Sequence, residues 1–141
     1  MKLLCLMIAG GLGAGARYGL TLLIQYYLEH GFLRNLSPLG AHFPLGTLVI
    51  NISGSFLLAL ITILALQGAV PPELSLIIGT GFVGAFTTFS TFELESHGLL
   101  SSGEWTQAMI YIFGNLLFGF IAVILGGMLA MKMIGGHLGN P

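Results

Sequence analysis

The sequence predicts an all-α membrane protein with four transmembrane helices, and three observations support this fold class. Only 6% of the 141 residues are charged and 55% are hydrophobic, whereas about 25% of residues in a soluble domain are charged. The apolar residues gather in four stretches, at about 3–28, 44–66, 73–97 and 108–133, each long enough to cross a hydrocarbon core of about 30 Å. The 22 glycines suit closely packed membrane helices. We therefore expect residues 1–141 to form a single membrane domain in a lipid bilayer.

The first span combines a glycine pattern with one charged residue. Gly11, Gly15 and Gly19 recur at every fourth position, a spacing that allows another helix to approach closely. Arg17 lies in the same span, where a charged side chain is costly and usually faces a cavity, a partner or the interface. A positive vestibule and a structural tie near a helix end both fit Arg17, and snorkelling to the headgroups is the simpler alternative.

The second span carries a polar stripe. Thr47, Asn51 and Ser55 are spaced by four residues, so their side chains share one face of a helix. An asparagine in the middle of a membrane span needs a polar partner. That partner is either a residue of another helix, in a hydrogen bond worth about 0.6–2 kcal/mol, or an ion in a pore. The spacing alone leaves both interpretations open.

The third span is expected to be a broken helix. Its run GTGFVGAFTTFSTF, residues 79–92, begins with three glycines and continues with hydroxyl residues alternating with phenylalanines. Each glycine lowers helix stability by about 1 kcal/mol relative to alanine, and hydroxyls in lipid must find partners. We expect the helix to open at Gly81 and Gly84 and to turn carbonyls toward a polar site. A tight helix–helix seam is the alternative, since small residues also serve packing.

The fourth span and the ionisable residues narrow the function class. Tyr111 and Asn115 are four residues apart and share a face with Gly119. They either form a polar track that faces another helix or make hydrogen bonds that serve helix packing. The net charge of −1 gives no reason to expect nucleic acid as a partner, and no nucleophile–base pair or metal-ligand cluster suggests an enzyme. A proton-coupled exporter of organic cations needs a carboxylate inside a span, and a non-conducting scaffold is a further alternative. All five acidic residues are placed near span ends: Glu29, Glu73, Glu93, Glu95 and Glu104.

The basic residues give almost no orientation signal. Four spans put both termini on one side of the membrane, with Lys2 and Lys132, and leave Arg34 on the other side. Orientation normally follows a clear excess of Lys and Arg on the cytoplasmic side. A chain with so small an excess can insert in both directions, and the two orientations could then pair as a symmetric dimer. A single topology set weakly by the first helix is the alternative.

Three stretches, in this order, resemble the Fluc (CrcB) family of fluoride channels. They are GGLGAGARYGL at 10–20, PLGTLVINISGSF at 44–56 and the run at 79–92, and the four-helix layout covers nearly the whole chain. The resemblance implies a multi-pass protein of the inner (plasma) membrane that exports fluoride passively and lowers fluoride toxicity. It also implies an antiparallel, dual-topology homodimer.

The resemblance also assigns roles to individual residues. It places Phe89 and Phe92 at the fluoride pore with Asn51 beside them, and it makes the carbonyls of Gly84 and Thr87 ligands of a structural sodium ion at the dimer centre. Aromatic ring edges are positive and can contact an anion, whereas Phe86, off that face, is expected to tolerate leucine. The remaining candidates for the pore are polar or charged residues: Arg17, Thr47, Ser90, Thr91, Tyr111 and Asn115.

Overall fold

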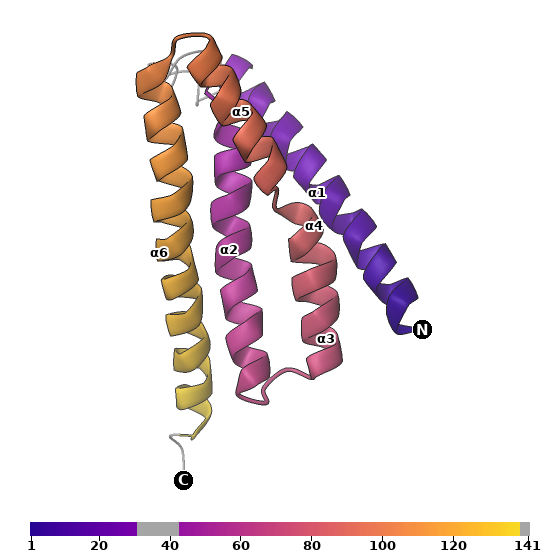
Figure 1. Ribbon diagram of the computed structural model, residues 1–141. Coiled ribbons are helices and arrows are strands. Elements are labelled where there is room, and N and C mark those ends of the chain that lie inside the picture. The colour runs from indigo at the N-terminus through magenta and orange to yellow at the C-terminus, as the bar shows by residue number, and fades with distance from the viewer. Residues whose placement is uncertain (31–42, 139–141) are drawn as a thin grey trace.

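The computed structural model describes residues 1–30 and 43–138, and all regular structure in this part of the chain is helical (Figure 1). Three spans are single helices, α1 (Lys2–His30), α2 (Leu45–Leu66) and α6 (Trp105–Leu138). The other span, Pro72–Ser101, is built from four pieces. These pieces are α3 (Pro72–Leu76), the π-helical segment η2 (Ile77–Val83), α4 (Gly84–Phe86) and α5 (Phe89–Ser101). Four segments are thus long and apolar enough to cross a membrane.

Short turns join the helices at two ends of the molecule. At the end that we call the terminal end, α2 stops where Gly68 takes a φ of +75°, a left-handed conformation that glycine adopts without strain. Pro72 then occupies the first turn of α3, where a missing N–H costs nothing. At the opposite end, the loop end, Gly103 takes a φ of +80° between α5 and α6. Arg34, which entered the charge comparison, lies outside the described residues.

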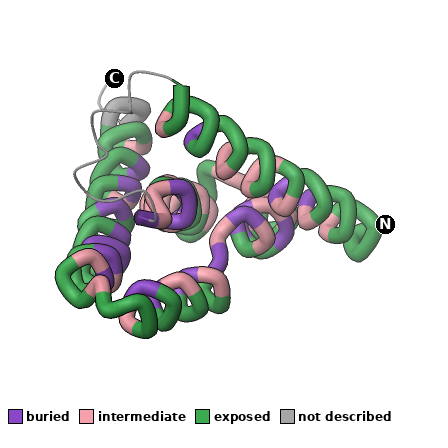
Figure 2. Tube along the Cα trace, turned by 90° about the horizontal axis from the view of Figure 1, so that it is seen from above, coloured by how far each residue is buried: buried purple, intermediate pink, exposed green. Residues whose placement is uncertain are grey.

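The spans pack around α2. This helix lies along α6, while α1 packs mainly on η2 and α4, and α5 packs on α6. The start of α1 and the end of α6 both lie toward the terminal end, as four spans require (Figure 1), and there Lys2 of α1 forms an ion pair with Glu73 of α3. Seen from above, the buried segments face inward and the outer faces are exposed (Figure 2). Those outer faces are apolar, with Phe113, Leu116 and Phe120 of α6 all exposed, as expected of a surface that faces lipid.

The interruption of the third span differs from the prediction. Gly81 lies inside η2 and Gly84 begins α4, so the expectation that the helix opens at these glycines is wrong. The backbone leaves the helix at Thr87 and Thr88, with ψ angles of 158° and 114°. Gly81 has a packing role instead, because a Cβ at this position would lie 2.9 Å from the Cβ of Ala9 on α1. Gly81 therefore lets α1 approach, and the threonines make the break.

Candidate ion pathway

Polar side chains from three helices meet between α2, α5 and α6. Thr47 Oγ1 donates a hydrogen bond to Glu95 Oε1 at 3.1 Å, and the Tyr111 hydroxyl donates to Glu95 Oε2 at 2.6 Å. Further along the same helices, Asn51 Nδ2 donates to Asn115 Oδ1 at 3.1 Å, and Asn115 Nδ2 donates to the Tyr111 carbonyl at 3.0 Å. These contacts form one connected network, which we call the polar track. The stripe predicted on α2 and the pair predicted on α6 therefore face each other.

Asn51 also holds the break of the third span. Its Oδ1 accepts the Thr88 N–H at 3.0 Å, and its Nδ2 donates to the Thr88 carbonyl at 3.3 Å. Both backbone polar groups of Thr88 are thus bonded to one side chain of another helix. Because an unpaired backbone group inside a membrane costs several kcal/mol, this clamp supports the irregular backbone between α4 and α5. The structure thus gives Asn51 the first of its two predicted roles, an interhelical tie, and places that tie in the polar track.

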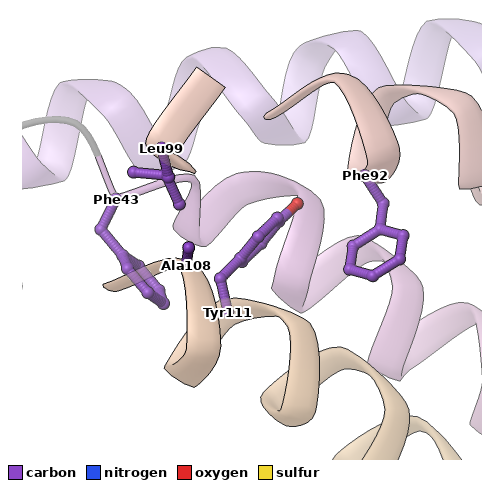
Figure 3. Close-up of a cluster of buried hydrophobic side chains, with 5 residues drawn as sticks. All are labelled: Phe43, Phe92, Leu99, Ala108 and Tyr111. Atoms are coloured by element: carbon purple, nitrogen blue, oxygen red, sulfur yellow. The ribbon is translucent and has the colours of Figure 1, made fainter. Parts of the chain in front are cut away.

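Aromatic rings line one side of the track. Tyr111 lies between Phe43 and Phe92 (Figure 3), with ring centroids 5.7 Å and 5.5 Å away. Phe92 is 8% exposed, but Phe89 is 68% exposed although the two rings are 5.8 Å apart. The structure therefore brings Phe92 into the track and leaves Phe89 at its outer edge. Phe86 is buried and stacks on Phe82, so we no longer expect it to tolerate leucine.

Glu95 is the functional residue that the sequence analysis missed. It was grouped with acids near span ends, but its half-buried carboxylate lies within the span and joins α2 to α6 through Thr47 and Tyr111. One sequence signal was present: Glu95 follows Phe92 by three residues, and residues three apart share a helical face. Glu93, two residues earlier, is exposed. The carboxylate holds two hydroxyl donors in place along the track.

Two cavities adjoin the track. A cavity of about 640 Å³ at the loop end is lined by Thr47, Glu95 and residues of α1, including Thr21 and Glu29. A second cavity, of about 210 Å³, is lined by Asn51 and by residues at the break. The loop-end cavity thus borders the track at Thr47 and Glu95, and the second cavity borders it at Asn51.

Three predicted pore residues lie away from this network. Arg17 is half-buried on α1 and lines neither cavity. Ser90 is exposed. Thr91 is half-buried and bonds to Thr88, whose Oγ1 accepts the Thr91 N–H at 3.3 Å and caps α5. The single chain therefore gives Arg17 and Ser90 no contact with the track, and it gives Thr91 a capping role beside the break.

The break changes the partners of the two carbonyls that the resemblance assigned to sodium. In an uninterrupted helix, the N–H groups of Thr88 and Thr91 would donate to the carbonyls of Gly84 and Thr87. Here the Thr88 N–H donates to Asn51 and the Thr91 N–H donates to the Thr88 side chain. Both carbonyls have lost their regular helical donors, and oxygen atoms are the ligands that hard cations prefer. The residues present therefore fit a small hard cation.

Comparison with known proteins agrees with this architecture. The family model described as "CrcB-like protein, Camphor Resistance (CrcB)" matches residues 4–127. A relative from Hydrogenobaculum sp., named fluoride-specific ion channel FluC, is 38% identical over 98% of this chain and 100% of its own length. A Bacillus cereus protein named fluoride-specific ion channel FluC 1 is 43% identical, covering 93% of this chain and 88% of its own. A Thermus thermophilus protein named fluoride-specific ion channel FluC is 38% identical, covering 95% and 98%. The chain therefore belongs to the CrcB (FluC) family, whose members are multi-pass ion channels of the bacterial inner membrane and not enzymes.

Proposed function

We propose that this protein is a fluoride-selective channel that lets cytoplasmic fluoride leave the cell down its electrochemical gradient. The observation that carries the proposal is the line of hydrogen-bond donors in the polar track. Thr47 and Tyr111 carry hydroxyls and Asn51 and Asn115 carry amide N–H groups, which donate to protein acceptors in this structure and would exchange them for the anion. Three relatives named as fluoride-specific channels align over nearly the whole chain, which supports the same conclusion.

The chemistry of the track suits a small anion. Fluoride is strongly hydrated, so a pore must replace its water with donors, as other channels replace hydration shells. The ring of Phe92 beside Tyr111 can add a positive edge without a fixed charge that would trap the ion. No described Lys, Arg or His lines either cavity, and the fixed charges that do line the loop-end cavity are the carboxyl groups of Glu29, Glu95 and Glu104, which cannot trap an anion. A weakly binding, donor-lined path favours conduction over storage of the ion.

Export needs no energy source other than the membrane potential. Hydrogen fluoride is a weak acid that crosses membranes as a neutral molecule and dissociates at cytoplasmic pH. A negative interior drives the trapped anion outward with about 2.3 kcal/mol per charge per 100 mV. A passive channel would therefore lower the cytoplasmic fluoride concentration and protect the cell.

The decisive experiment is fluoride efflux from liposomes that contain the purified protein. We expect rapid fluoride efflux and, under the same gradient, little chloride efflux. Protein-free liposomes give the background, and light scattering checks that the vesicles remain intact. Fluoride efflux at the background rate, or equal efflux of fluoride and chloride, would refute a fluoride-selective channel.

The functional unit in this proposal is an antiparallel, dual-topology homodimer. A Cβ built on Gly11, Gly15 or Gly19 would meet no described atom within 4 Å, so the glycine face of α1 is open to a partner helix. Cys5 is exposed near the N-terminus and reports orientation when labelled from one side of intact vesicles. Labelling from each side should modify about half of the protein. If Cys5 were modified by reagent on one side of the vesicles and never by reagent on the other side, dual topology would be refuted.

A structural sodium ion at the centre of the dimer completes the proposal. The carbonyls of Gly84 and Thr87 would hold it, because the break has removed their helical donors. When bound, the ion would fix the break by charge–dipole attraction and take no part in fluoride movement. Replacing sodium with a bulky organic cation should shift the protein toward the monomer in size-exclusion chromatography. Unchanged dimer elution and unchanged fluoride flux without sodium would count against this site.

A further inference from the structure

The carboxamide of Asn51 has no donor left for an anion in this structure. Its orientation is fixed, because Oδ1 accepts the Thr88 N–H at 3.0 Å. The Nδ2 group then has two hydrogens, and these donate to the Thr88 carbonyl at 3.3 Å and to Asn115 Oδ1 at 3.1 Å. Fluoride can bind Asn51 only if one of these acceptors gives way.

Asn115 is the acceptor that can move. The Thr88 carbonyl belongs to the backbone of the break, where Asn51 holds both polar groups of Thr88. Asn115 is a side chain on α6, and rotation about its last side-chain torsion, which is broad and two-fold, exchanges Oδ1 for Nδ2. This rotation breaks two bonds, the one from Asn51 Nδ2 to Asn115 Oδ1 and the one from Asn115 Nδ2 to the Tyr111 carbonyl on the same helix. The side chain is 8% exposed, so water does not readily replace either contact.

We propose that Asn115 is a reversible internal stopper of the fluoride path, an inference that rests on the proposed function. Without fluoride, Asn115 Oδ1 occupies the Asn51 donor and keeps it satisfied. When fluoride reaches Asn51, the Asn115 carboxamide turns over and directs its N–H groups at the anion. One side chain thus acts as an acceptor when the track is empty and as a donor when it is loaded.

This exchange favours fluoride over larger halides. An incoming anion must compete with a neutral amide oxygen for the same N–H group. Fluoride is a compact and strong hydrogen-bond acceptor, whereas chloride spreads the same charge over a larger radius and accepts more weakly. Asn115 therefore discriminates by acceptor strength, in addition to any discrimination by size.

Three substitutions separate this role from a purely structural one. Asn115→Asp has nearly the same shape and still accepts from Asn51, but its ionised carboxylate has no hydrogen to donate. We expect it to lower fluoride efflux by more than tenfold and up to about 100-fold, the factor that corresponds to one lost hydrogen bond to a charged group. Asn115→Ser can both accept and donate and should keep efflux within about tenfold of the parent. Asn115→Leu can do neither and should be as inactive as the Asp variant.

A second measurement removes the ambiguity that the Asp charge or a folding defect would cause. Selective ¹⁵N labelling of asparagine in the parent protein gives side-chain amide signals for Asn35, Asn51, Asn115 and Asn140. Fluoride titration should shift the signals of both Asn51 and Asn115, whereas chloride at the same concentrations should shift neither.

The outcomes are distinct. Suppose that the parent conducts fluoride. If its Asn115 amide signals then do not respond to fluoride, or if Asn115→Asp conducts as well as the parent, the stopper is overturned and the channel assignment stands. A parent that does not conduct fluoride overturns the proposed function itself. Responsive Asn115 signals with an inactive Asp variant and an active Ser variant support the stopper.

Discussion

Replacing Asn51 should both loosen the break and stop fluoride. The side chain joins α2 to the break through two hydrogen bonds with Thr88 and joins α2 to α6 through one with Asn115. Asn51→Leu keeps the same branched shape in a somewhat larger side chain and removes all three bonds. Asn51→Asp keeps only the acceptor for the Thr88 N–H and points a carboxylate oxygen at two other acceptor oxygens. The two variants therefore differ by one retained bond.

The expected loss of stability follows from the number of bonds. Hydrogen bonds between membrane helices contribute about 0.6 kcal/mol on average and up to about 1.7. Three lost bonds in Asn51→Leu therefore give a decrease of about 2–5 kcal/mol in the free energy of unfolding. Asn51→Asp loses two bonds and gains repulsion between oxygens, which places it in the same range.

Denaturant unfolding in detergent micelles measures stability, and liposome efflux at matched protein content measures conduction. Ser53→Ala is the matched control, because Ser53 lies on the same helix but bonds only to Val49 and Ile50 carbonyls of α2 itself. We expect Ser53→Ala to change the unfolding free energy by no more than about 0.5 kcal/mol. If Asn51→Leu were as stable as Ser53→Ala, the clamp on Thr88 would not support the break, and the reasoning would fail.

Three further predictions concern the aromatic wall, helix packing and topology. Phe92→Ile keeps an apolar side chain but deletes the ring edge beside Tyr111. It should lower fluoride efflux at least tenfold while dimer elution is unchanged. The exposed Phe113 of α6 provides the control, since Phe113→Ile should conduct normally. Gly126→Ala should destabilise the protein by about 1–3 kcal/mol, because the new Cβ would lie 2.4 Å from the Phe56 carbonyl oxygen. Gly127→Ala is the control: the atom nearest to its Cβ would be 3.9 Å away, so it should be neutral or stabilising in the same unfolding assay. Two lysines added beside Lys132 should fix one orientation of the chain and reduce the efflux rate. If Cys5 labelling still found both orientations in this variant, the prediction would be contradicted.

Composition and spacing were sufficient for the outline of the fold. Low charge and long apolar stretches predicted an all-helical membrane protein, and the structure shows four helical spans able to cross a membrane. The four-residue spacing of Thr47 and Asn51, and of Tyr111 and Asn115, predicted two polar faces. These faces do meet, because among the residues that the structure describes their side chains bond to each other, to the break and to Glu95.

The position of the break could not be read from glycine content. A glycine in a membrane helix signals either flexibility or a close neighbour, and here Gly81 has the close neighbour. The better signal was Thr88 followed three residues later by Thr91, since a threonine at a helix start caps the next turn. The partners of Glu95 could not be predicted either, because a sequence shows distance along the span but not which helices pack around it. Its position weakens the composition argument against a cation exporter, and that exclusion now rests on family membership.

The wide turn of η2 has a consequence for which changes the chain can accept over time. Hydrogen bonds in this segment span five residues, as from the Gly84 N–H to the Gly79 carbonyl, so the segment accommodates one residue more than an α-helical turn. Deleting any one residue from Ile77–Val83 would allow regular α-helix to form. Because the wide turn already absorbs one extra residue, the helix that follows would keep its orientation, and Thr88 would still face Asn51. A one-codon deletion within the regular helix α2 has no such extra residue to remove and would rotate everything that follows in that helix by about 100°.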